Sequence, residues 1–340
     1  MACRVSRGIA LFLLYVCTAA CSSAPVASAP SPPPAGSPAS SPRPSVSPSS
    51  SPSSSPSPTY PPYYIESLRA RSYGGGKIDI RDQMFRGSGY TKFHMAWPSG
   101  DQVMTGTISL PDGPGPFPVV VVNHGFIPMD RYWIGQDSGI FGDPMAAHGF
   151  ISVAPNYPGY AGSGPGLPNM PQIVATAITV MDLVGSLSSL PQADTSKVGM
   201  MGHSNGGGVS LLVMSVDPRV KAFALYAPVS SDMRDNARKW WLRSGSQGPL
   251  GNPDENPDGY AHISPRNYLD RTRSPVLFLQ GTEDEDIPAS WTQATLDALQ
   301  SKGIPNRWIS FPGGYHDLVG ADLASANAAA EAWIRQGIGA

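Results

Sequence analysis

The chain has 340 residues, of which 41% are hydrophobic and 14% are charged, and its formal net charge is -2. This length suits one large domain or two small ones, and near-neutral charge gives no electrostatic reason to expect nucleic-acid binding. The three cysteines, Cys3, Cys17 and Cys21, all lie near the N-terminus. The rest of the chain therefore has no disulfide, no thiol nucleophile and no cysteine metal ligand.

Residues 1–21 have the pattern of an export signal, with two arginines before a short apolar run at residues 8–16. This run is too short for a comfortable membrane span. Small residues then lead directly to Cys21, an order that resembles a bacterial lipobox. We expect a lipid on Cys21 and a location in the bacterial cell envelope. Ordinary cleavage after Ala20, with free secretion, is the alternative.

Residues 22–58 are a low-complexity stretch of Pro, Ser and Ala. They contain one charged residue, Arg43, and no aromatic residue, so they cannot build a hydrophobic core. Proline at this density favours an extended chain. We predict a disordered tether here, and a folded catalytic domain over residues 59–340.

Strands and helices alternate through this domain. Three short strands at the start indicate an antiparallel ribbon, and the β-branched run at 117–122 is typical of a strand buried on both faces. The alternation predicts a doubly wound, mostly parallel sheet, with a short insertion after the sixth strand, at residues 231–262. The predicted strands are 77–85, 91–97, 105–110, 117–122, 150–155, 198–201, 222–228, 275–280 and 307–311, and the helices are 143–148, 170–190, 209–214, 289–300 and 321–335.

Gly202-His203-Ser204-Asn205-Gly206 stands between an apolar strand and an apolar helix. This is the pattern of a nucleophile elbow, in which a serine at a strained turn exposes its hydroxyl above the sheet. The two glycines let strand and helix approach closely. A glycine-rich turn in an ordinary α/β domain is the alternative reading, and the rest of the chain decides between them.

A nucleophilic serine needs a base and a carboxylate that orients it, in the chain order Ser, acid, His for this architecture. His316 follows the last predicted strand and is the candidate base. Asp284 follows the preceding strand and is the candidate acid, with Asp286 as the other candidate. The backbone N–H groups of Asn205 and Phe126 are the candidate oxyanion donors.

Aromatic residues from several loops are expected at the same edge of the sheet. Trp133, Tyr160, Trp240 and Trp241, together with Phe126, are candidates for the walls of an acyl pocket. The alternative is that the two tryptophans of the insertion only pack it onto the sheet.

The chain resembles an α/β-hydrolase, and its last third is similar to the catalytic domain of the prolyl-oligopeptidase family of serine peptidases. The similar stretches are 202–207, 264–277, 281–288 and 311–316. The resemblance implies that the acid is the residue three after Gly281, which is Asp284. It also implies a peptidase that works through an acyl-enzyme.

Two features depart from that family. The roughly 60 residues between Tyr60 and Phe117 are too few to make the β-propeller of its larger members. In addition, Asn123 stands where true prolyl oligopeptidases place a tyrosine that donates to the oxyanion. These departures leave room for ester substrates.

We therefore expect an exported serine hydrolase acting on small esters or short peptides. A carboxylesterase with little peptidase activity is one alternative, and a non-catalytic surface-binding protein on the same scaffold is a remote one. Neither a dinucleotide-binding nor a P-loop motif is present, no metal-ligand spacing is evident, and no cofactor is implied.

Overall fold

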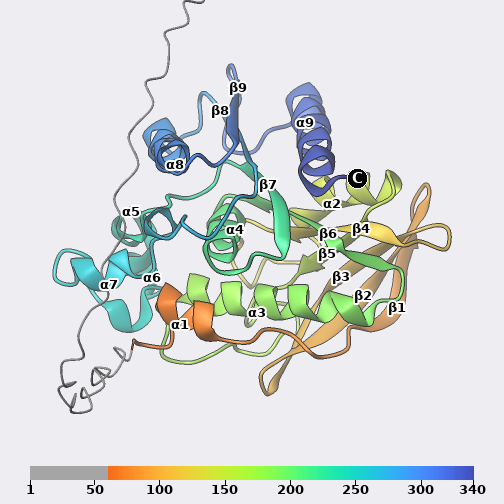
Figure 1. The fold of residues 1–340 in the computed structure, drawn as a ribbon, viewed down its shortest axis with the longest axis horizontal. Helices are drawn as coiled ribbons and strands as arrows, with labels where there is room; N and C mark the ends of the chain where they lie inside the picture. Colours follow the sequence, from red (N-terminus) through yellow and green to blue (C-terminus); the bar gives the residue numbers. More distant parts are fainter. Residues whose placement is uncertain (1–59) are drawn as a thin grey trace, which may run out of the picture. The chain divides into compact units, whose positions relative to one another are not determined.

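The computed structural model describes residues 60–340, which fold around one nine-stranded sheet (Figure 1). The strand order is β1-β2-β3-β5-β4-β6-β7-β8-β9. The predicted export signal and tether lie outside the described residues. The strands are β1 (Asp79–Arg86), β2 (Tyr90–Ser99), β3 (Gln102–Pro111), β4 (Phe117–Asn123), β5 (Ile151–Pro155), β6 (Ala193–His203), β7 (Val220–Tyr226), β8 (Val276–Gly281) and β9 (Asn306–Phe311).

The sheet has an antiparallel part and a parallel part. Strands β1, β2 and β3 form an antiparallel ribbon, which joins the rest of the sheet where β3 pairs with β5. Every pair from β5 through β4 to β9 is parallel. The predicted mostly parallel sheet with an N-terminal ribbon is thus confirmed. The carboxyl ends of the parallel strands share one edge, where ligand sites form in such sheets.

Helices cover both faces of the sheet because its central strands are apolar on both sides. Val119 and Val121 of β4 face the core beneath α1, α3, α4 and α8, while Val120 and Val122 face α2 and α9. Figure 1 shows these two layers. The helices are α1 (Ile65–Ala70), α2 (Ser138–Ala147), α3 (Gln172–Ser186), α4 (Asn205–Val216), α8 (Ala289–Ser301) and α9 (Gly320–Ile338).

The segment Gln172–Ser189 is apolar and long enough to cross a membrane, judged by length and composition alone. It is 78% buried inside the fold, however, as expected for a core helix that packs against the sheet.

The insertion follows β7, which is the seventh strand and not the sixth as predicted. The sixth strand, β6, cannot carry it because Ser204 and helix α4 follow that strand without a break. The insertion consists of short helical turns rather than one long helix. They are α5 (Met233–Asn236), η2 (Ala237–Trp241), α6 (Leu242–Ser244), η3 (Gly248–Leu250), α7 (Pro257–Ala261) and η4 (Pro265–Asn267).

Candidate active site

Ser204 occupies a strained turn between β6 and α4. Its backbone has φ 51° and ψ -115°, a conformation that non-glycine residues rarely adopt and that tends to occur at functional sites. The flanking glycines are required by close contacts. A Cβ on Gly206 would lie 2.2 Å from the Asn123 carbonyl oxygen, and one on Gly202 would lie 2.4 Å from the Gly206 carbonyl oxygen. This is the geometry of a nucleophile elbow.

We expect Gly206→Ala to destabilise the protein by about 1–3 kcal/mol, because the added methyl group meets main-chain atoms that cannot rotate away. Gly139→Ala in α2 is a matched control. There a Cβ would meet only side-chain atoms at 3.5 Å, and alanine favours the helix. Thermal unfolding of both variants checks this expectation. Equal melting temperatures for the two variants would contradict it.

His316 and Asp284 form a hydrogen-bonded pair. Nδ1 of His316 lies 3.1 Å from each carboxylate oxygen of Asp284, whose side chain is only 2% exposed. The backbone N–H groups of Asp286 and Ile287 donate to Oδ1 of Asp284 at 3.0 and 2.9 Å. Burial by itself raises the pKa of the Asp284 carboxyl, but these hydrogen bonds and the His316 ring outweigh it and lower the pKa below its ordinary value.

Asp286, the other candidate acid, has a different environment. Its side chain is exposed and lines the cavity, and among the described residues His316 bonds to Asp284 alone of these two carboxylates. The Asp286 carbonyl oxygen instead accepts a hydrogen bond from Nζ of Lys239, which fastens the insertion to this loop. The geometry therefore favours Asp284 as the partner of the imidazole.

The two candidate oxyanion donors flank the serine. Phe126 and Asn205 both line the cavity, and within residues 60–340 neither backbone N–H has a hydrogen-bond acceptor. His124, just before this turn, is fully buried and stacks on Tyr157 with ring centroids 3.8 Å apart. Burial lowers the pKa of His124 to about 4, so it is a neutral structural residue that shapes the turn.

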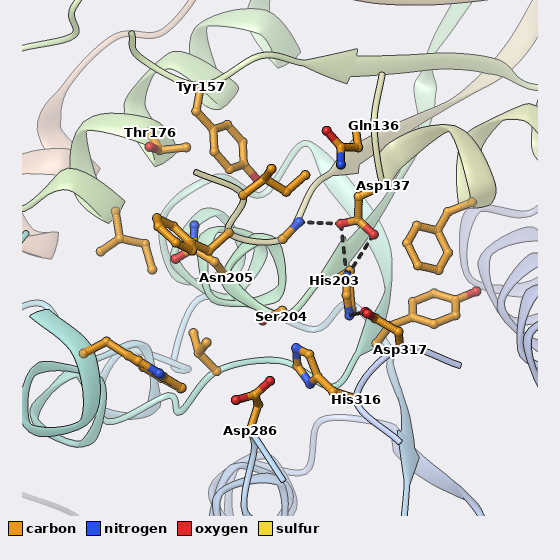
Figure 2. A pocket seen from close by; sticks show the side chains of 18 of the residues that line it. Gln136, Asp137, Tyr157, Thr176, His203, Ser204, Asn205, Asp286, His316 and Asp317 are labelled. Carbon is orange, nitrogen blue, oxygen red and sulfur yellow. Dashed lines mark hydrogen bonds and ion pairs between the residues drawn. The ribbon is translucent and has the colours of Figure 1, made fainter. Parts of the chain in front are cut away.

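These groups converge on one cavity of about 900 Å³. Ser204 and His316 both line it and lie near each other in Figure 2. Ser204 Oγ forms no hydrogen bond within the described part of the chain, and such contacts commonly tighten only when substrate binds. The lining combines polar and charged side chains, among them Asp137, His203 and Lys239, with a larger apolar surface. The cavity walls include Phe126, Ile140, Phe141, Tyr157, Tyr160, Ile173, Val229, Trp240, Trp241, Leu318, Val319 and Leu323.

The structure separates the candidates for the pocket wall. Tyr160, Trp240 and Trp241 line the cavity, whereas Trp133 is not among the lining residues and its side chain is 63% exposed. Trp133 lies in the loop between β4 and α2, and its ring extends into solvent instead of into the site. Trp241 is nearly buried, at 7% exposure, and belongs to the core as well as to the wall.

Asn123, where the family pattern has a tyrosine, does not face the substrate. Its side chain is fully buried and its Nδ2 donates to Ser210 Oγ at 2.9 Å. It therefore ties β4 to α4 beneath the elbow and does not supply an oxyanion donor.

Sequence reasoning missed a second carboxylate–imidazole contact beside the serine. Nδ1 of His203 lies 3.0 Å from both carboxylate oxygens of Asp137. His203 was visible inside the elbow motif, but Asp137 stands in a loop with no motif of its own. Among the described residues, no group of three or more His, Cys, Asp or Glu side chains could hold a metal ion.

The sheet order, the strained serine turn and the Asp–His pair at the carboxyl edge define the class as an α/β-hydrolase. The profile of the prolyl oligopeptidase family matches residues 143–339. The chain belongs to the prolyl oligopeptidase family. This confirms the resemblance found in the sequence, and the predicted class of serine hydrolase agrees with it.

Individual relatives support the same placement. Dipeptidyl-peptidase 5 of Porphyromonas gingivalis is 27% identical over 183 residues, which cover 51% of this chain and 26% of that protein. The chain spans about a quarter to a third of the curated relatives it matches. Among solved structures, acetyl xylan esterase 1 from Thermoanaerobacterium sp. has a TM-score of 0.60 at 18% identity, covering 80% of this chain and 90% of that one.

A peptidase structure is also similar. An acylaminoacyl peptidase in complex with Z-Gly-Gly-Phe-chloromethyl ketone has a TM-score of 0.57 at 22% identity, with 70% of this chain and 40% of that one covered. At these identities the two structures show that the fold is shared, and both esterases and peptidases carry it.

Proposed function

We propose that the protein is a serine hydrolase that cleaves acyl bonds through a covalent acyl-enzyme on Ser204. One observation carries the proposal. A serine held in a strained elbow and an imidazole paired with a buried carboxylate face the same cavity. The match to the prolyl oligopeptidase family supports it independently.

In the proposed reaction, Ser204 Oγ attacks the carbonyl carbon of the substrate while Nε2 of His316 takes the hydroxyl proton. Asp284 keeps the ring oriented and stabilises the imidazolium that forms. The backbone N–H groups of Phe126 and Asn205 stabilise the negative charge that develops on the carbonyl oxygen by donating hydrogen bonds to it. His316 then gives its proton to the leaving group, and a water molecule activated by His316 releases the acid.

We propose small or medium esters and short peptide-like molecules as substrates. Within residues 60–340 no β-propeller screens the cavity, so its apolar walls must select the substrate. A carboxylesterase with little peptidase activity is the second candidate, favoured by the similarity to an esterase over 90% of that chain. A panel of p-nitrophenyl esters beside aminoacyl anilides separates the two candidates. If the protein turned over neither the esters nor the anilides, the proposal would be contradicted.

Trp240 and Trp241 should affect activity differently. Trp240 is only partly buried and lines the cavity, so Trp240→Ala is expected to change the preference along an ester chain-length series by roughly 1–3 kcal/mol. Trp241 is almost fully buried, so Trp241→Ala should lower stability by about 3–5 kcal/mol. Ester kinetics and melting curves measure both effects. If Trp240→Ala slows all esters equally and melts early, the residue is structural.

We also propose that the protein is exported and anchored by a lipid on Cys21, with residues 22–58 as a tether. The support is the sequence of the leader alone, since these residues lie outside those that the structure describes. Metabolic labelling with a palmitate analogue should tag the wild-type protein and leave Cys21→Ala untagged. Release of an untagged wild-type protein into the medium would favour simple secretion instead.

A further inference from the structure

His203 lies at the end of β6, directly before Ser204, with its side chain between two loops of the site. Its ring is buried and lines the cavity, 5.0 Å from the His316 ring between centroids. One loop, residues 124–137, carries the Phe126 N–H. The other, residues 312–319, carries His316. The proposed mechanism gives His203 no role.

Asp137 joins His203 to the first of these loops. Its carboxylate accepts hydrogen bonds from Nδ1 of His203 at 3.0 Å and from the Gly125 N–H at 2.5 Å. Asp137 also has φ 65°, a strained conformation for aspartate that persists only where its surroundings enforce it. Because Gly125 immediately precedes Phe126, this carboxylate helps fix the direction of the oxyanion donor.

Asp317 joins the same imidazole to the second loop. Its Oδ1 lies 3.4 Å from Nε2 of His203, and it is the neighbour of His316 in the chain. Figure 2 shows His203 between the two carboxylates, with His316 beside it. The His203 ring therefore connects the loop that carries the Phe126 N–H to the loop that carries His316.

The surroundings of His203 favour a ring that carries a proton on both nitrogens. Nδ1 lies 3.0 Å from the Asp137 carboxylate, while Nε2, which has no hydrogen-bond partner within the described residues, lies 3.4 Å from the exposed carboxylate of Asp317. A neutral ring would point a lone pair at one of these two carboxylates. Burial lowers the pKa of His203, but the charge of Asp137, its hydrogen bond and the charge of Asp317 outweigh burial and raise the pKa. Two more titratable groups of the described residues interact with the ring: His316, whose ring centroid lies 5.0 Å away, and His124, whose pKa His203 helps to lower.

We propose that His203 is a positioning residue. As an imidazolium between Asp137 and Asp317, it fixes the loop that carries the Phe126 N–H (residues 124–137) relative to the loop that carries His316 (residues 312–319). The inference rests on the proposed function. Below the unfolded pKa of histidine, the imidazolium contacts are fully present. They are lost as pH rises through the raised folded pKa of His203, so the maximal rate falls on the alkaline side.

The test compares variants of the full-length protein with p-nitrophenyl butyrate across pH. His203→Gln keeps one donor but no charge, and we expect kcat to fall roughly 10- to 100-fold, as for small misplacements of reacting groups, with KM little changed and no alkaline fall. His94→Gln is the control, since His94 makes an exposed contact with Asp82 at 2.8 Å on the ribbon. It should behave as wild type.

Asp317→Asn provides a second test, through the pH dependence of kcat. A purely structural role of His203 would leave this pH dependence unchanged. Loss of this charge should shift the alkaline fall in kcat to lower pH, while Asp101→Asn, on an exposed turn far along the sheet, should leave the profile in place. If His203→Gln does not fold, the ring nitrogens of His203 can be followed directly. NMR of the full Ser204→Ala protein should show both nitrogens protonated at neutral pH.

Three results would overturn the proposal. They are a wild-type rate and pH profile in His203→Gln, an unshifted profile in Asp317→Asn, and a neutral His203 ring at neutral pH. Failure of the proposed function looks different, because the wild-type protein would then take no covalent fluorophosphonate label at Ser204.

Discussion

Ser204→Ala should lower kcat/KM for p-nitrophenyl butyrate by about 10⁵- to 10⁶-fold, the scale seen when a serine hydrolase loses its nucleophile. The substitution removes the attacking oxygen and nothing else of consequence. Alanine keeps the Cβ, so the strain at φ 51° is unchanged, and within residues 60–340 the hydroxyl bonds to no other group. The melting temperature should therefore stay within about 2 °C of wild type.

Ser188→Ala is the matched control for this substitution. Ser188 is exposed beside α3, and within residues 60–340 its hydroxyl hydrogen-bonds only to the Gly185 carbonyl oxygen, so its loss should not alter turnover. If Ser204→Ala keeps more than about a tenth of the activity of Ser188→Ala, Ser204 is not the nucleophile.

Asp284→Asn should lower kcat by about 10⁴-fold, because an amide no longer stabilises the imidazolium and favours the wrong tautomer of His316. The hydrogen bonds from the Asp286 and Ile287 N–H groups to Oδ1 can persist with an asparagine oxygen. The fold should therefore survive, and circular dichroism checks that it does. Steady-state ester kinetics then measure the loss.

Asp286→Asn is a close control in the same loop, with the same change of charge. Its carboxylate is exposed and is not the partner of His316, so we expect only a few-fold change in kcat. The reverse pattern, in which kcat falls by orders of magnitude in Asp286→Asn and only a few-fold in Asp284→Asn, would mean that the acid had been assigned to the wrong residue.

The order of strands and helices could be predicted from the sequence because each buried strand is a continuous apolar run. The run at β4 and the alternation after it define a parallel sheet without knowledge of any contact. The boundaries of α2 and α9 were less accurate. Helix α2 begins at Ser138, before its predicted start at 143, and α9 continues to Ile338, past its predicted end at 335, because the added residues are too few to carry a periodic signal.

The pairing of His316 with Asp284 was predictable because each follows one of the last two strands, and the structure places β8 beside β9. The bridge from Asp137 to His203 was not predictable. It joins residues 66 positions apart through a loop of irregular backbone, and loop geometry leaves no periodic trace in a sequence. For the same reason, nothing in the sequence placed Trp133 outside the cavity.

The most direct test of a covalent serine mechanism is to locate the acylated atom. The purified protein is treated with a fluorophosphonate, digested and mapped by mass spectrometry. We expect one adduct per chain, on Ser204 in the peptide that contains Gly202 and Gly206, and no adduct in Ser204→Ala. An adduct on another residue, or equal labelling of Ser204→Ala, would contradict it.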